Sequence, residues 1–146
     1  MAVTVRDAAP GDAGRLAVLL TQLGYPCTGP EVAGRLRYWL DDPFSRVLVA
    51  GNSGHVAGCL SVHAVPYLEK TGRWARIESL VVDTAARRTG TGRLLVAAAE
   101  DTARDWGCLA LEVTSARTRP EAHAFYQQLG FRDSCSRSAR YWKTIP

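Results

Sequence analysis

The strongest chemical signal in the chain is an apolar, strand-like segment that runs into a glycine-containing loop and then into a helix. The apolar segment at 77–83 is followed by the loop sequence Arg-Arg-Thr-Gly-Thr-Gly-Arg at 87–93. Glycines let a ligand approach the backbone, and the N–H groups at a helix start point outward at the positive end of the helix dipole. Arginine adds fixed charge that suits phosphate. The segment therefore predicts a phosphate-binding cradle, although a purely structural turn would carry the same glycines.

Two common nucleotide-binding motifs do not fit this loop. No Gly-Lys-Ser/Thr follows the glycines, as a Walker loop requires, so hydrolysis of a nucleoside triphosphate is not expected. The dinucleotide fingerprint Gly-x-Gly-x-x-Gly, early in a β-α-β unit, is also missing.

A second segment makes the loop more informative. Residues 122–131 read Ala-His-Ala-Phe-Tyr-Gln-Gln-Leu-Gly-Phe. With Arg87-x-x-Gly90-x-Gly92 upstream, the chain resembles the GCN5-related N-acetyltransferase (GNAT) superfamily, whose pyrophosphate loop and closing Ala-x-x-Phe-Tyr-x-x-x-Gly-Phe element are similar to these two segments. The resemblance covers nearly the whole chain. It implies one N-acetyltransferase domain over 1–146 and an acyl-coenzyme A N-acyltransferase.

The resemblance also implies acetyl-coenzyme A as a co-substrate. The loop would bind its pyrophosphate, and the backbone of Leu80 and Val82 would bind the pantetheine arm like a missing strand, with one amide free to polarise the thioester. Many members carry Asn where this chain has Arg119, which leaves the cofactor role of Arg119 open. The expected cofactor-binding residues are Leu80, Val81, Val82, Arg87, Arg88, Thr89, Gly90, Thr91, Gly92, Arg93, Arg119 and Phe125.

Acetyl transfer to an amine needs a base and an acid. An alkylammonium of pKa ~10 costs about 4 kcal/mol to deprotonate at pH 7, and a carboxylate acting directly or through water can take that proton. The resemblance places this general base at Glu78, on the strand before the loop, although Glu78 could merely pair with Arg76. It places the general acid at Tyr126, although an aromatic residue on an apolar helix face is usually core.

Two histidines are alternative bases. His63 ends a strand near the expected acceptor cleft, whereas His123 is expected to face outward from its helix. No set of His, Asp and Glu residues has metal-ligand spacing, so no metal is expected.

Hydrophobic periodicity and turn residues predict the elements that position these groups. Strands are expected at 3–6, 46–50, 55–62, 73–82 and 109–113, the last of them buried. Helices are expected at about 10–23, 28–41, 91–106 and 120–129. Residues 131–142 are expected to form a last strand or strand pair. The resulting order is β-α-α-β-β-β-α-β-α-β, a mixed α/β sheet, and the early hairpin excludes a regular Rossmann repeat.

Composition is that of a globular protein. The 146 residues are 47% hydrophobic and 22% charged with net charge +4, and they contain no apolar run of the ~20 residues that a membrane helix needs. Neither a membrane nor a nucleic acid is an expected partner, and a cytoplasmic, bacterial protein is expected. Four cysteines without paired spacing are expected to be reduced and structural.

The acceptor is the least determined part. The region from Glu78 to Phe131 most resembles small bacterial acetyltransferases of aminoalkylphosphonates and aminoglycosides, so the expected partner is a small-molecule primary amine. Arginines suit a phosphonate and carboxylates suit a polycation, and the chain has both. A protein or peptide N-acetyltransferase and a non-catalytic acetyl-coenzyme A sensor remain alternatives, and a homodimer remains possible.

Overall fold

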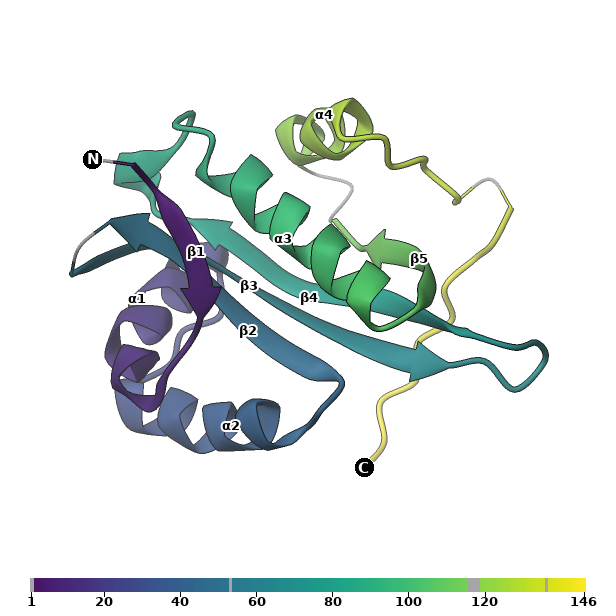
Figure 1. The fold of residues 1–146 in the computed structure, drawn as a ribbon, viewed down its shortest axis with the longest axis horizontal. Coiled ribbons are helices and arrows are strands. Elements are labelled where there is room, and N and C mark those ends of the chain that lie inside the picture. Colours follow the sequence, from purple (N-terminus) through teal and green to yellow (C-terminus); the bar gives the residue numbers. More distant parts are fainter. Residues whose placement is uncertain (1, 53, 116–118, 136) are drawn as a thin grey trace. The chain divides into compact units, whose positions relative to one another are not determined.

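The computed structural model describes residues 2–52, 54–115, 119–135 and 137–146. It contains two compact units, Met1–Thr114 and Ser115–Pro146. The turn of the expected hairpin, between the strands at 46–50 and 55–62, includes residue 53, which lies outside the described residues. The first unit holds the sheet and most of the helices, whose order along the chain can be followed in Figure 1.

Local sequence signals explain where the first two helices begin and end. A 3-10 turn at Pro10–Asp12 leads into α1 (Ala13–Leu23), which ends at Gly24 in a left-handed conformation with φ 112°. That conformation favours glycine. The second helix, α2 (Gly29–Asp41), begins at a capping box in which Thr28 and Glu31 exchange side chain to backbone hydrogen bonds. The predicted helix signals are confirmed here.

Five strands form one sheet in the order β1-β2-β3-β4-β5. The first four, β1 (Thr4–Asp7), β2 (Ser45–Asn52), β3 (His55–Pro66) and β4 (Arg73–Val82), pair antiparallel. The fifth, β5 (Cys108–Val113), pairs parallel with β4 after the crossover helix α3 (Thr91–Asp105). The strand predicted over 73–82 is confirmed at both ends.

The sheet separates two helical layers, as Figure 1 shows. On one face Val49, Cys59 and Val81 pack with Leu16 of α1 and Val32 of α2 in one buried cluster. On the other face α3 lies close to β3: a Cβ on Gly58 would stand 3.2 Å from the Leu95 and Thr91 side chains. Both faces of the central strands are therefore covered by helices and buried from solvent. This fits the nearly continuous apolar sequence of β2 and β3.

Two expectations about the later strands need correction. The strand at 109–113 was expected to be buried, but β5 is the edge of the sheet and Leu109 is 62% exposed. Residues 131–135 and 137–146 form no strand, so the last predicted strand is not found in the described part of the chain. No strand of the described sheet pairs with this segment, and an unpaired strand is not stable alone.

The described residues of the second unit contain one helix, α4 (Pro120–Gln128), with Pro120 at its first position. The chain turns at Gly130, whose φ is 91°, as predicted for the helix end. Within the described residues, no helix is long and apolar enough to cross a membrane. All four cysteines are free thiols, as expected.

Candidate active site

Glu78 lies at an irregular point of β4. Pairing with β3 joins Ser61 to Ser79 and Val62 to Ile77, so Glu78 is an extra residue without a partner on β3. The pairing of β4 with β5 ends at Ile77 and Val113, whereas β4 itself continues to Val82. A β-bulge and the end of the β4–β5 pairing thus meet at Glu78, and such bulges often re-aim a side chain next to an active site.

The bulge decides which face Glu78 occupies. Val81 belongs to the cluster under α1 and α2. Glu78 contacts His63, whose ring lies edge-on to Trp39 of α2 with the centroids 6.0 Å apart, and this places Glu78 on the same face. Residues three apart in a regular strand point to opposite faces. The bulge therefore lets both the carboxylate and the core residue Val81 point toward α1 and α2.

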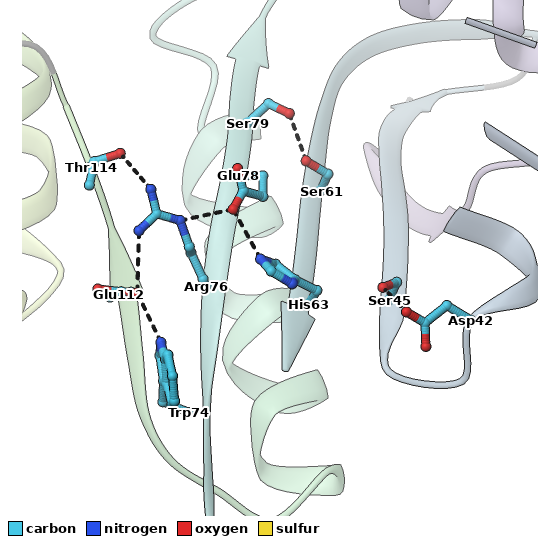
Figure 2. A network of polar contacts seen from close by, with 10 residues as sticks. All are labelled: Asp42, Ser45, Ser61, His63, Trp74, Arg76, Glu78, Ser79, Glu112 and Thr114. Carbon is cyan, nitrogen blue, oxygen red and sulfur yellow. Dashed lines mark hydrogen bonds and ion pairs between the residues drawn. The ribbon is translucent and has the colours of Figure 1, made fainter. Parts of the chain in front are cut away.

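The Glu78 carboxylate is held by two nitrogen donors (Figure 2). Its Oε1 atom lies 3.0 Å from His63 Nε2 and 2.9 Å from Arg76 Nε. The Glu78 side chain is 40% exposed, so water and a small molecule can reach it. The pairing with Arg76, which the sequence offered as the structural alternative for Glu78, is present together with this accessibility.

Arg76 connects Glu78 to the neighbouring strand. Its Nη1 donates to Glu112 Oε1 at 3.3 Å, and its Nη2 donates to Thr114 Oγ1 at 3.3 Å. The indole N–H of Trp74 donates to the same Glu112 oxygen at 2.9 Å. All three guanidinium nitrogens of Arg76 are thus committed, as Figure 2 shows, and Arg76 joins β4 to β5 immediately before the strands part.

The loop after β4 is anchored by Asp83, which is buried. Its carboxylate accepts hydrogen bonds from the Ala85 N–H at 3.0 Å and from the Arg15 guanidinium of α1. The amide of Gln22 reaches the same carboxylate at 3.5 Å and accepts the Thr84 N–H at 3.1 Å. The Ala85 N–H, together with Arg15, lowers the pKa of Asp83 to about 2. Helix α1 therefore fixes the start of the loop.

The glycine loop itself has the geometry of an anion cradle. Arg88 has φ 64° and Gly90 has φ 85°, so the backbone is in the left-handed region at both residues before α3 begins. Gly90 is the N-cap of α3 and offers no capping side chain. The N–H groups of the first turn are thus left for a ligand at the positive end of a 15-residue helix. Arg87, Arg88 and Arg93 are exposed around it.

The other predicted residues of the first unit lie along the same path. Leu80, Val81 and Val82 form the end of β4, where the structure shows no pairing with β5. The Thr89 hydroxyl lies 2.8 Å from that of Thr91, which is buried in the first turn of α3. Gly92 follows Thr91 in the same turn. A pocket of about 270 Å³ lies beside the loop, next to Asp83, Ala85 and Thr89, and Glu78 is not among the residues that line it.

The predicted residues of the second unit are grouped on α4. Arg119 is the N-cap residue of α4 and makes no capping hydrogen bond with its side chain. The Tyr126 ring packs edge-on against Phe125 and Phe131, at centroid distances of 5.3 and 5.7 Å. Burial raises the pKa of Tyr126, and Arg119 opposes this shift. The phenol is therefore protonated at neutral pH. The alternative base His123 also lies on α4 and is half-buried.

Some residues of the site could not be selected from the sequence. Arg15 and Gln22 are 68 and 61 residues away from Asp83, so their contacts depend on the packing of α1 against the sheet. Asp83 had a usable signal, because an aspartate directly after a strand is a frequent cap of a following turn. Among the described residues, no group of three or more His, Cys, Asp or Glu side chains could hold a metal ion.

Comparison with known proteins finds acetyltransferases. A search of curated proteins finds 32% identity over 93 residues with the aminoalkylphosphonate N-acetyltransferase of Salmonella typhimurium, covering 64% of this chain and 60% of that protein. It finds 34% identity over 87 residues with the blasticidin-S acetyltransferase of Streptomyces morookaense, covering 59% and 58%. The matched segments thus span less than two thirds of these relatives.

Among solved structures, a transcriptional regulator from Bacillus halodurans superposes with a TM-score of 0.86 at 29% identity, over 99% of both chains. The family model for the acetyltransferase (GNAT) family matches residues 18–131, from within α1 to just beyond α4. Members of this family are acyltransferases that use acetyl-coenzyme A as co-substrate. Because the match covers most of the sequence, this chain belongs to the acetyltransferase (GNAT) family.

Proposed function

We propose that this protein transfers the acetyl group of acetyl-coenzyme A to a primary amine of a small molecule, with Glu78 as general base and Tyr126 as general acid. The observation that carries the proposal is the position of Glu78. Its accessible carboxylate stands at the bulge where β4 loses β5, five residues before the anchored start of the anion-binding loop. The match at 18–131 includes parts of both compact units and supports a single N-acetyltransferase domain over 1–146.

Different residues bind different parts of the co-substrate. The N–H groups of the first turn of α3, with Arg87, Arg88 and Arg93, bind the pyrophosphate. The backbone of Leu80 and Val82 binds the pantetheine arm along the unpaired part of β4. Acetyl-coenzyme A supplies the activated acetyl carbon. Thr89 supports the loop, while Arg119 and Phe125 contribute contacts from α4.

Glu78 accepts a proton and Tyr126 donates one during the reaction. The amine nitrogen bonds to the acetyl carbon, and the bond from that carbon to sulfur breaks. Glu78 accepts the first proton that the ammonium group loses, directly or through one water, and Tyr126 donates a proton to the departing thiolate. The second proton that the nitrogen loses as the amide forms restores the Tyr126 hydroxyl. A positioned base or acid of this kind contributes about 10²–10⁴-fold in rate. The raised pKa of Tyr126 keeps its proton available at neutral pH.

The charges around Glu78 favour a cationic acceptor. Glu112 shares the Arg76 guanidinium with Glu78, and Asp42 is a third carboxylate, close to His63. A phosphonate would need a guanidinium whose charge is not already balanced by carboxylates. The acceptor is therefore an amine with a second positive charge, in contrast to the substrate class in the name of the Salmonella relative.

The test is release of free coenzyme A from acetyl-coenzyme A with a panel of amines: aminoglycosides, polyamines, blasticidin S, aminoalkylphosphonates and short peptides. The readout is chromatographic, because the four thiols of the protein would react with a thiol dye. Glu78→Gln should abolish most turnover, whereas Glu100→Gln, the same change on the surface of α3, should not. Turnover of peptides alone would point to a protein acetyltransferase. Binding of acetyl-coenzyme A without turnover would point to a sensor.

A further inference from the structure

His63 is the second nitrogen donor to the proposed base. It lies opposite Arg76 in the β3–β4 pairing, and its Nε2 atom is 3.0 Å from Glu78 Oε1. Arg76 Nε donates to the same oxygen. Among the described residues, the hydrogen bonds to Glu78 end on Oε1, so Oε2 is the oxygen that can receive a proton from an amine or a water.

The groups around the His63 ring come from three elements. Glu78 and Arg76 lie on β4, Trp39 lies on α2, and Asp42 follows α2 directly. The Phe44 N–H and the Ser45 hydroxyl lower the pKa of Asp42, and His63 acts in the same direction from nearby. The His63 side chain is 31% exposed, so it can exchange protons with water. Figure 2 shows the side chains of Arg76, Glu78, His63, Ser45 and Asp42.

Among these groups, His63 is the one whose ring can be either neutral or positively charged while it keeps the same hydrogen bond to Glu78. A neutral His63 gives Glu78 one hydrogen bond and no charge. A protonated His63 gives the same hydrogen bond and adds a positive charge next to the one on Arg76. In the protonated state Glu78 stands between two cations, which weakens its affinity for a proton and its attraction for an ammonium group.

From this geometry we infer that His63 is a positioning residue that makes the base pH-dependent: it orients Glu78 in both states and permits proton transfer only when it is neutral. The inference rests on the proposed function, in which Glu78 is the base. It goes beyond that function because it assigns the acid-side loss of activity to His63, a residue that need not touch the substrate.

The experiment compares kcat/KM for the best amine of the panel between pH 5.5 and 8.5 in the wild type and four variants. His63→Gln keeps an N–H donor near the place of Nε2 but cannot become charged, and His63→Ala removes the donor. His55→Gln, at the opposite end of β3, is the matched control. Glu78→Gln tests the base itself.

At pH 7.5 and above, His63→Gln should stay within about threefold of the wild type. Between pH 7.5 and 5.5 the wild type should lose several-fold more activity than His63→Gln, because only the wild type gains a second cation beside Glu78. His63→Ala should be slow at every pH, and His55→Gln should follow the wild type.

A wild-type pH profile in His63→Gln, with Glu78→Gln inactive, would overturn the role of His63 and leave the proposed function standing. Full activity of Glu78→Gln, or no turnover with any amine, would overturn the proposed function and this inference with it.

Discussion

Arg76 and Glu112 face each other across the only parallel strand pair of the described sheet, with 3.3 Å between Arg76 Nη1 and Glu112 Oε1. This is the second-to-last pair before β4 and β5 part. The same guanidinium holds Glu78 through Nε. One side chain thus contacts both the proposed base and the neighbouring strand close to the point where the two strands part.

Arg76→Gln should therefore lower activity more than stability. The Glu78 and Glu112 side chains are 40% and 47% exposed, and exposed ion pairs contribute about 0–1 kcal/mol, so the free energy of unfolding should fall by less than about 1 kcal/mol. The value of kcat/KM should fall at least about tenfold, because Glu78 loses a donor to Oε1. Urea unfolding and steady-state kinetics measure the two effects. Arg35→Gln, which breaks an exposed pair on α2, should change neither.

Asp83→Asn should loosen the loop and change how stability depends on pH. The folded-state pKa of Asp83 is about 2, below the value near 4 of an unfolded aspartate. Its ionised form thus stabilises the fold above about pH 4, and this contribution is lost as pH falls from about 4 to about 2. In urea unfolding at pH 7, 4, 3 and 2, wild type and Asp83→Asn should differ most at pH 7 and converge near pH 2. A constant difference would contradict this account of Asp83.

The same variant should raise KM for acetyl-coenzyme A while changing KM for the amine little. The reason is that Asp83 holds Ala85, at the beginning of the loop, through its backbone N–H. Asp101→Asn removes an exposed carboxylate from α3 and serves as the control.

Gly90→Ala changes the backbone conformation that the loop prefers without removing a charged or polar side chain. A Cβ at Gly90 would meet no atom within 4 Å, but φ is 85°, a left-handed conformation that costs a residue with a Cβ roughly 1–2 kcal/mol. Stability should fall by about that amount, and KM for acetyl-coenzyme A should rise. Gly34→Ala, inside α2 with equally open space, should instead stabilise the protein by up to about 1 kcal/mol.

Tyr126→Phe removes one oxygen from α4 and keeps the ring packing against Phe125 and Phe131. If Tyr126 protonates the thiolate, kcat should fall about 10²-fold or more with little change in KM. Because burial raises the pKa of Tyr126, the wild-type rate should persist through the pH at which an ordinary tyrosine ionises, near 10. Tyr141→Phe, at a residue that is 94% exposed, should be neutral. An unchanged kcat in Tyr126→Phe would remove Tyr126 from the mechanism.

The order of the elements up to α4 could be predicted because its signals are local. The Thr28–Glu31 capping box, Gly24 and the apolar run of β4 each act over a few residues. The bulge at Glu78 could not be predicted, because it depends on the register in which β4 pairs with β3. An even alternation from 74 onward would have put Glu78 and Val81 on opposite faces of the sheet.

The residues that hold the site depend on the same non-local pairing. Arg15 meets Asp83 only after α1 packs on the sheet, and His63 meets Glu78 across two strands. The candidate base and the loop were recognisable from their motifs. Their supporting contacts were not, since a motif of this kind contains the reacting groups and not the side chains that orient them.

The last prediction concerns the charge of the acceptor. A linear diamine and an aminoalkylphosphonate of equal chain length offer the same amine and opposite distal charges. Because Glu78 and Glu112 both pair with Arg76 and Asp42 lies close to His63, the diamine should have the higher kcat/KM by about tenfold, equal to about 1.4 kcal/mol. Glu112→Gln should reduce this preference. So should 1 M salt, because the screening length falls to about 3 Å there. A preference for the phosphonate that Glu112→Gln strengthens would mean that an arginine outside this network, such as Arg119 on α4, binds the acceptor.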